Sequence, residues 1–131
     1  MHRNIKAMNE KSLKVLMVDD EEMILETVCV LLERYGYSVT SVDSGEKAID
    51  LLKQDDHGID IIILDMLMPG MDGCETFDHV RRIQPDMPVL IASGRTYSDQ
   101  IDRVKNNGCK GILQKPYRAS DLHMEIQKCF S

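Results

Sequence analysis

Short apolar runs alternate along the chain with longer stretches in which apolar residues recur at helical spacing. The runs predict five strands: Leu13–Val18, Ser38–Val42, Ile59–Leu64, Pro88–Ala92 and Gly111–Leu113. Strands that alternate with helices are typical of βαβ units, which place parallel strands in one sheet with helices on both faces. The expected fold class is therefore α/β, a doubly wound five-stranded parallel sheet with five helices.

The first expected helix carries one apolar stripe at i, i+4, i+7, i+8 and i+11: Ile24, Val28, Leu31, Leu32 and Tyr35. Gly36 follows the stripe and can end the helix in the left-handed conformation. Shorter apolar sets mark the other helices: Ala48, Leu51 and Leu52; Phe77 and Val80; Ile101 and Val104; Leu122, Ile126, Cys129 and Phe130. Ser44 is a plausible N-cap for the second helix, Pro85 stops the third, and Gly108 closes the fourth.

The third run is apolar without alternation from Ile61 to Leu64, as expected of a strand that is covered on both faces. Right-handed crossovers then place the carboxyl ends of all the strands along one edge of the sheet. Residues 1–12 are polar and lack periodicity, which indicates a flexible lead-in. Residues 13–131 are expected to form one domain.

Composition limits the function classes. The chain has 131 residues, 43% hydrophobic and 29% charged, which is typical of one globular domain. A net charge of −6 without a run of Lys and Arg argues against binding to nucleic acid or anionic lipid. No stretch approaches the roughly 20 apolar residues of a membrane span, and no signal-peptide core begins the chain. We therefore expect a soluble cytoplasmic protein.

Four cysteines and four histidines are scattered singly, without the spacing of a zinc site. Small buried or half-buried thiols in a reducing compartment are the simplest interpretation of the cysteines.

Polar residues follow four of the predicted strands: Asp19 and Asp20 the first, Asp65 the third, Ser93 the fourth and Lys115 the fifth. Ligand sites in such sheets form outside the carboxyl ends of the strands. Each residue alone has an ordinary explanation, such as a helix-dipole partner, a turn or a surface loop. Their joint occurrence at the strand ends favours a common site.

Crowded carboxylates repel one another unless a cation lies between them, and Mg²⁺ prefers hard oxygen ligands. A carboxylate is also a competent nucleophile towards phosphorus. Phosphoryl transfer needs charge neutralisation and positioning, which a metal and a lysine supply. The residues at this edge therefore indicate a phosphoryl-accepting site.

Four blocks resemble the signature motifs of response-regulator receiver domains: Val18-Asp19-Asp20-Glu21, Asp65-Met66-Leu67-Met68-Pro69-Gly70-Met71-Asp72-Gly73, Ala92-Ser93-Gly94 and Gln114-Lys115-Pro116-Tyr117. The resemblance covers residues 13–131 with matching order and spacing. It implies a flavodoxin-like receiver fold and a phosphorylation-dependent switch in two-component signalling. The last two blocks look similar to those of receiver domains in hybrid histidine kinases. The alternative is that the chain is a stand-alone regulator.

The resemblance implies that Asp65 is the phosphoacceptor, with Ser93 hydrogen-bonded to the phosphoryl group and Lys115 paired with it. It implies a Mg²⁺ ion bound directly by Asp20, Asp65 and the backbone carbonyl of Leu67. Asp19 would act on the ion mainly through a bound water. It also implies a cis bond between Lys115 and Pro116.

The same resemblance implies the partners. A histidine kinase or a phosphotransfer domain would supply the phosphoryl group. A downstream protein would bind the face made by the fourth helix, the fifth strand and the fifth helix. Beyond its own phosphoryl transfer and slow self-dephosphorylation, no enzymatic activity is expected.

Two departures from the family pattern matter. Ile112 stands three residues before the lysine, where the family carries a mobile aromatic side chain. Leu67 and Arg95 occupy positions that influence how water reaches the phosphoryl group. We hypothesise that Leu67 shields the acyl phosphate and makes self-hydrolysis slow.

Two other classes are weighed against this interpretation. A haloacid-dehalogenase-like phosphatase also uses a strand-end aspartate, but it needs a second one two residues later, where Leu67 stands. A flavodoxin-like electron carrier needs a first loop rich in Ser and Thr, whereas residues 19–22 are Asp-Asp-Glu-Glu. Activity on a generic phosphoester, or a coloured protein, would favour one of these.

Overall fold

The computed structural model describes residues 12–68, 70–94 and 98–130. In these residues one sheet contains five strands: β1 (Lys14–Val18), β2 (Ser38–Val42), β3 (Ile61–Asp65), β4 (Val89–Ser93) and β5 (Gly111–Gln114). The strand order is β2-β1-β3-β4-β5, and each neighbouring pair is parallel. The predicted strands and their parallel arrangement are confirmed, with ends that differ by one or two residues.

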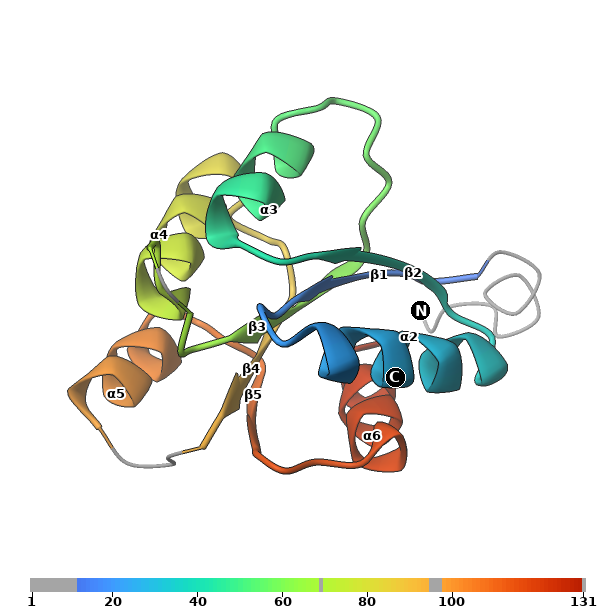
Figure 1. Ribbon diagram of the computed structural model, residues 1–131. Helices are drawn as coiled ribbons and strands as arrows, with labels where there is room; N and C mark the ends of the chain where they lie inside the picture. Colours follow the sequence, from blue (N-terminus) through green and yellow to red (C-terminus); the bar gives the residue numbers. More distant parts are fainter. Residues whose placement is uncertain (1–11, 69, 95–97, 131) are drawn as a thin grey trace.

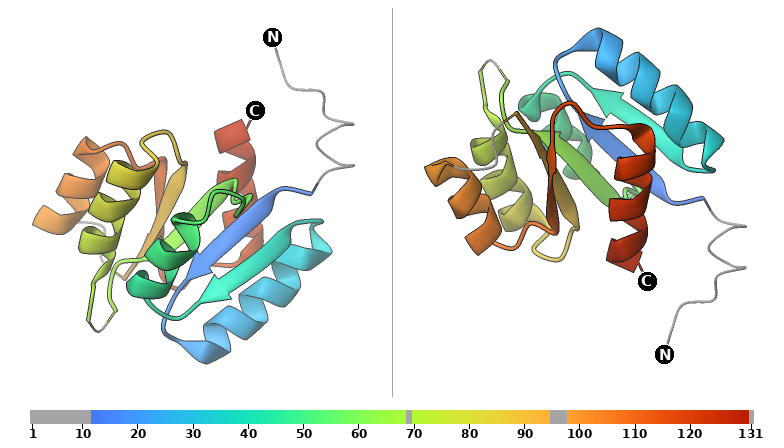
Figure 2. Two further views of the ribbon diagram at one scale, coloured as in Figure 1. Left: turned by 90° about the horizontal axis from the view of Figure 1, so that it is seen from above. Right: turned by 90° about the horizontal axis from the view of Figure 1, so that it is seen from below.

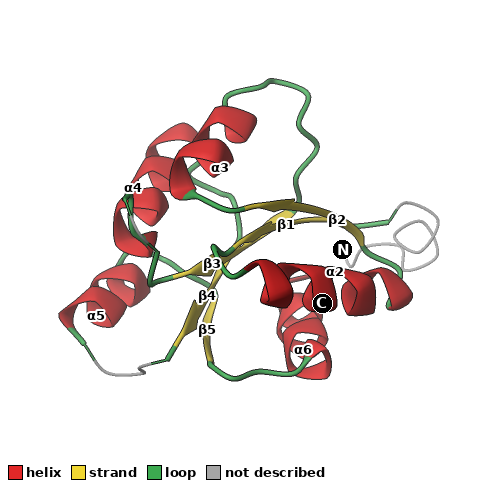
Figure 3. Cartoon of the chain, in the orientation of Figure 1, coloured by secondary structure: helices red, strands yellow, loops and turns green. Residues whose placement is uncertain are grey.

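Helices cover both faces of this sheet (Figures 1 and 2). Those in the described residues are α2 (Glu22–Arg34), α3 (Gly45–Leu52), α4 (Gly73–Ile83), α5 (Asp99–Asn106) and α6 (Ala119–Phe130). Helices α2 and α6 lie on one face, and α3, α4 and α5 on the other (Figure 3). This is the doubly wound α/β fold that the alternation predicts.

The hydrophobic core has two parts, one on each face of the sheet. Successive residues of β1 alternate between them: Val15 and Met17 pack under α2 and α6, whereas Leu16 and Val18 pack under the other three helices. All five residues of β3 are buried. A central strand must be apolar on both sides, so its sequence shows no alternation.

The predicted helix ends are confirmed at three positions. The Ser44 hydroxyl accepts a hydrogen bond from the Lys47 N–H at 3.2 Å, as an N-cap does. Gly36 and Gly108 follow α2 and α5 with φ of 99° and 91°. Glycine adopts this left-handed backbone without the clash that a Cβ would cause.

The buried face of α2 differs from the predicted stripe. Leu25, Val28 and Leu32 are its buried residues, at i, i+3 and i+7. Tyr35 is 46% exposed and stacks on the ring of His123 of α6, with ring centroids 4.2 Å apart. The prediction was wrong at Tyr35 because it began the stripe at Ile24. The buried face begins one position later, at Leu25.

Some sequence-based predictions fall outside the described residues: almost all of the lead-in at residues 1–12, the motif residue Pro69, and Arg95, which was expected to influence how water reaches the phosphoryl group. None of the helices in the described ranges has the length and apolar character to cross a bilayer. The cysteines in those ranges are free thiols: Cys29, Cys74, Cys109 and Cys129.

Candidate functional site

The residues predicted to form a site lie at the carboxyl edge of the sheet. Asp65 and Ser93 are the last residues of β3 and β4, while Asp19 and Lys115 directly follow β1 and β5. The strand register places Asp65 beside Ala92 and pairs Ser93 with Gln114. Parallel pairing therefore brings together side chains that are up to 96 positions apart in the sequence.

The ammonium of Lys115 lies among three carboxylates. Its Nζ is 3.2 Å from Oδ2 of Asp19, 3.2 Å from Oδ1 of Asp65 and 3.4 Å from Oε1 of Glu21. Asp19 and Asp65 are nearly inaccessible, at 1% and 4% exposed. One ammonium thus lies beside two buried carboxylates and one exposed carboxylate, which places a compensating positive charge at the end of β3.

Burial is the largest cause that raises the pKa of Asp65, and the neighbouring Asp19 carboxylate is the second largest. The pKa of Asp65 is raised to about 6. Lys115 opposes that rise through its charge and a hydrogen bond. Burial acts to lower the pKa of Lys115, but the carboxylates of Asp65 and Asp19 hold it above its usual range. At neutral pH the pair is therefore a carboxylate and an ammonium.

Backbone hydrogen bonds fix the positions of these side chains. The Asp19 N–H donates to the carbonyl of Val42, which joins the end of β1 to β2. The Lys115 N–H donates to the carbonyl of Ser93 at 2.8 Å, and the bond between Lys115 and Pro116 is cis, as the resemblance implied. The lysine therefore leaves the sheet directly beside β4.

The start of α4 lies against the end of β3. The Asp72 carboxylate caps this helix by accepting from the Glu75 N–H at 2.9 Å, and the Gly73 N–H donates to the Met66 carbonyl. A Cβ on Gly73 would lie 2.5 Å from the carbonyl oxygen of Asp65 and from Cα of Met66. The Asp-Gly pair of the second motif thus allows the helix to approach the strand that carries Asp65. The sequence alone did not indicate the packing role of this pair.

Ser93 and Leu67 line a hollow of about 400 Å³ beside the site, together with residues at the start of α5. Ser93 is 7% exposed, whereas the side chain of Leu67 is 85% exposed. The Leu67 N–H donates to Oδ1 of Asp65 at 3.4 Å. Ser93 and Leu67 therefore both lie near the end of β3.

The acidic group differs in membership from the predicted one. In the part of the chain that the structure describes, the carboxylates whose oxygens lie within 4.8 Å of one another belong to Asp19, Glu21 and Asp65. Asp20 is exposed and lines another hollow with Asp43 and Lys47. Its role as a direct ligand stays a prediction. Glu21 is part of the first motif, but no role was predicted for it. Its position two residues after Asp19 was the feature of the sequence that could have indicated a place in the acidic group.

Comparisons with known proteins agree on one family. A family model described as "Response regulator receiver domain" matches residues 15–127. The curated response regulator SaeR of Staphylococcus aureus strain USA300 is 31% identical over 112 residues, which are 86% of this chain and 48% of that protein. The chain thus spans about half the length of the curated relatives it matches.

Solved structures show the same similarity. A receiver domain protein from Clostridium thermocellum superposes with a TM-score of 0.83 at 30% identity, covering 90% of this chain and 94% of that one. The chemotaxis protein CheY4 of Vibrio cholerae gives 0.81 at 30% identity, covering 89% and 98%. A CheY-like receiver domain protein from Methanospirillum hungatei JF-1 gives 0.85 at 22% identity, covering 92% and 94%, and supports the fold alone.

Proposed function

This chain belongs to the family of response-regulator receiver domains, and we propose on that basis that Asp65 is its phosphoacceptor. The function of the family is a phosphorylation-dependent switch in two-component signalling. The observation that carries the assignment to Asp65 is the Lys115 ammonium, 3.2 Å from its carboxylate at the end of β3. We propose that residues 13–131 form the receiver domain.

The phosphodonor is a phosphohistidine of a histidine kinase or of a phosphotransfer domain. An oxygen of the Asp65 carboxylate attacks the phosphorus, and the new O–P bond forms as the P–N bond of the donor breaks and the imidazole leaves. With its pKa raised to about 6, Asp65 is mostly ionised at neutral pH, as a nucleophile must be. The product is an aspartyl phosphate.

The donors present at the site fit Mg²⁺, because they are carboxylate oxygens gathered within 4.8 Å of one another. When bound, Mg²⁺ supplies charge neutralisation for the phosphoryl oxygens. Asp65 would hold it directly and Asp19 through a water, with Asp20 and the carbonyl of Leu67 as further ligands. Glu21 is an additional acid within the same group.

Ser93 and Lys115 would respond to the new charge on Asp65. The phosphoryl group carries about −1.5 to −2 charges in place of the single charge of the ionised Asp65 carboxylate, and its oxygens attract the Lys115 ammonium and the Ser93 hydroxyl. Ser93 ends β4, and the chain continues from it towards α5. Drawing Ser93 inward would therefore bias the position of α5 and of the face that it forms with β5 and α6. We propose that a downstream protein binds this face.

Leu67 would set the lifetime of the phosphorylated state. It lies two residues after Asp65, and its side chain borders the hollow that also contains Ser93. An apolar group there offers no hydrogen bond to an attacking water, so we propose slow self-hydrolysis. Apart from this reaction and its own phosphoryl transfer, we propose no enzymatic activity, and we propose a cytoplasmic location. A phosphatase or an electron carrier is not favoured by the family match.

Phosphoryl incorporation tests this function. The wild-type protein should take up acid-labile phosphate from acetyl phosphate in the presence of Mg²⁺, and chelation of the metal should abolish uptake. Asp86→Asn, which alters an exposed acid in a turn, is the matched control and should be labelled normally. Absence of metal-dependent labelling in the wild type would contradict the proposal.

A further inference from the structure

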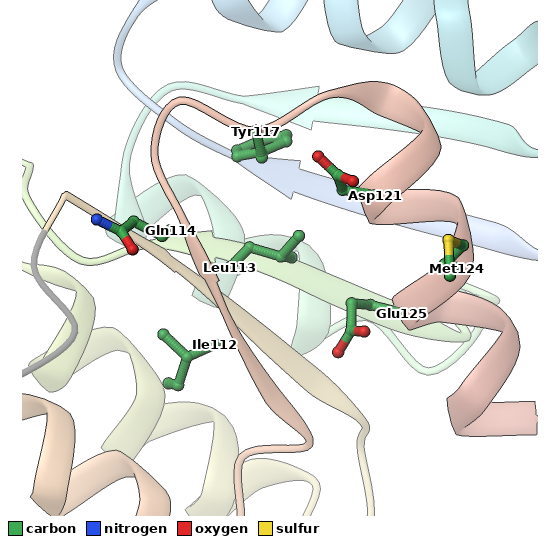
Figure 4. A pocket seen from close by; sticks show the side chains of 7 residues that line it. All are labelled: Ile112, Leu113, Gln114, Tyr117, Asp121, Met124 and Glu125. Carbon is green, nitrogen blue, oxygen red and sulfur yellow. The ribbon is translucent and has the colours of Figure 1, made fainter.

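The hydroxyl of Tyr117 is buried in a place where it pairs with nothing that the structure describes. Tyr117 lies two residues after Lys115 on the loop between β5 and α6 (Figure 4), and its ring packs against the core under α2 and α6. Among the described residues, its hydroxyl has no hydrogen-bond partner. Buried phenols normally have one, and a phenylalanine would fill the same space without an unpaired polar atom. The hydroxyl therefore requires an explanation.

The surroundings of Tyr117 connect it to the phosphorylation site. Its ring lines a hollow of about 580 Å³ together with Glu21, Lys115 and residues of α2. Burial raises the pKa of Tyr117 to about 12, and the Asp19 carboxylate is the next largest cause. The phenol is thus a protonated donor at neutral pH, within electrostatic reach of a buried acid.

That acid shares its cation with the phosphoacceptor. Lys115 Nζ lies 3.2 Å from both Asp19 and Asp65, so neither carboxylate holds it alone. A phosphoryl group on Asp65 adds negative charge and draws the ammonium towards itself. Asp19, 1% exposed, then loses the hydrogen bond that Lys115 donates to its Oδ2, and the proposed Mg²⁺ would reach this carboxylate only through a water. A buried carboxylate in that position needs another donor.

We propose that Tyr117 is a positioning residue for Lys115: its hydroxyl donates a hydrogen bond to Asp19 when the lysine turns to the phosphoryl group. The inference rests on the proposed function and deepens it. In the free state Lys115 satisfies Asp19 and the phenol is unpaired. In the phosphorylated state the phenol replaces the lysine at Asp19, which leaves the ammonium available to the phosphoryl group.

The same movement would reach the proposed downstream face. On its other side Tyr117 borders a hollow of about 260 Å³ between β5 and α6, together with Asp121 and Met124 of the helix (Figure 4). Ile112, which replaces the mobile aromatic of the family, packs on the opposite face of the sheet from Leu113 and the ring of Tyr117. Because Tyr117 lines the hollow between β5 and α6, a shift of its ring towards Asp19 would change the shape of that hollow.

The test compares Tyr117→Phe with the wild type, and Tyr37→Phe is the matched control because its hydroxyl has a partner, Nδ1 of His123 at 2.6 Å. Thermal midpoints are measured for the free proteins and with Mg²⁺ and beryllium fluoride, a phosphoryl mimic. Free Tyr117→Phe should unfold at or above the wild-type midpoint, whereas free Tyr37→Phe should unfold below it. With the mimic, Tyr117→Phe should show a clearly smaller rise in midpoint than the wild type and bind the mimic about fivefold more weakly.

Two results would overturn the inference alone. One is an equal response of Tyr117→Phe and wild type to the mimic, in both midpoint and affinity. The other is a loss of stability in free Tyr117→Phe as large as that of Tyr37→Phe, which would mean that the hydroxyl is paired before phosphorylation. A wild-type protein that neither responds to the mimic nor takes up phosphate would overturn the proposed function itself, and this inference with it.

Discussion

Lys115 and Asp65 form a contact of 3.2 Å across the carboxyl edge of the sheet, between the end of β3 and the residue that follows β5. Because Asp19 receives the same ammonium at the same distance, the lysine is the shared counter-charge of two buried acids. A change of charge at Asp65, the proposed phosphoacceptor, therefore changes how strongly Lys115 interacts with Asp19. Several properties of the protein should depend on this arrangement.

Replacement of the lysine should weaken both stability and signalling. In Lys115→Ala the carboxylates of Asp19 and Asp65 lose their cation, which should lower the free energy of unfolding by about 1–3 kcal/mol at neutral pH, since the lysine is partly exposed. Phosphorylation should remain possible, but phosphate should no longer change partner binding. Urea unfolding and a binding assay measure the two effects. Lys47→Ala, at an exposed ion pair with Asp43, is the control; unchanged phosphate-dependent binding in Lys115→Ala would refute the role.

Replacement of Asp65 by asparagine should stabilise the fold above pH 6. The folded-state pKa of Asp65 is about 6, above the ordinary aspartate value of 3.8, so ionisation is less favourable in the folded protein. The free-energy cost of ionising Asp65 in the folded protein is absent at pH values below its unfolded-state pKa. It is fully present at pH values above its folded-state pKa. Asp65→Asn removes this cost and should raise the free energy of unfolding by up to about 3 kcal/mol at pH 7.5. The lost contact with Lys115 reduces this gain.

Urea unfolding of Asp65→Asn and wild type across pH 4–8 measures this difference, which should vanish towards pH 4. A variant that is less stable than the wild type at pH 7.5, or a difference that grows as the pH falls, would contradict the pKa assignment. Asp86→Asn should show neither trend.

The side chain at Leu67 should control the lifetime of the phosphate. In Leu67→Asn a polar amide would stand two residues after Asp65 and could orient an attacking water, so hydrolysis should become roughly tenfold faster, equivalent to about 1.4 kcal/mol in the barrier. Release of phosphate after removal of the donor measures the rate. A wild-type half-life of seconds, or an unchanged rate in the variant, would argue against shielding by Leu67.

The close approach of α4 to β3 should not tolerate a side chain at Gly73. A Cβ there would lie 2.5 Å from backbone atoms of Asp65 and Met66, which cannot move without displacing the strand end. Gly73→Ala should therefore lose at least about 2 kcal/mol of stability and most of its phosphorylation. Gly94→Ala, where a Cβ would meet nothing within 4 Å, is the matched control for stability. Equal urea midpoints for the two variants would contradict this packing argument.

Much of the fold follows from local patterns in the sequence. The unbroken apolar run at Ile61–Leu64 predicts a central strand, and Ser44 and Gly36 predict helix ends, because each depends on its immediate neighbours. The predicted stripe included Tyr35, but this ring is 46% exposed and stacks on His123, a residue of a helix distant in sequence. Periodicity within one helix holds no information about such a neighbour.

The general location of the candidate site could be predicted from the strand pattern. Parallel strands align their carboxyl ends, so Asp19, Asp65 and Lys115 could be placed at one edge without coordinates. The direction of each side chain within that edge could not be derived, because it depends on loop conformation. The place of Glu21 in the acidic group depends on these loops. So does the burial of the Tyr117 hydroxyl, which has no hydrogen-bond partner among residues 12–68, 70–94 and 98–130.

The most direct measurement is the location of the phosphoryl group. After labelling with acetyl phosphate and Mg²⁺, borohydride reduction converts an aspartyl phosphate to homoserine, which mass spectrometry of peptides identifies. We expect homoserine at position 65 in the wild type, and no reduced product from Asp65→Asn. Conversion at another acidic residue, or labelling of Asp65→Asn at the wild-type level, would contradict the assignment of Asp65 as the phosphoacceptor.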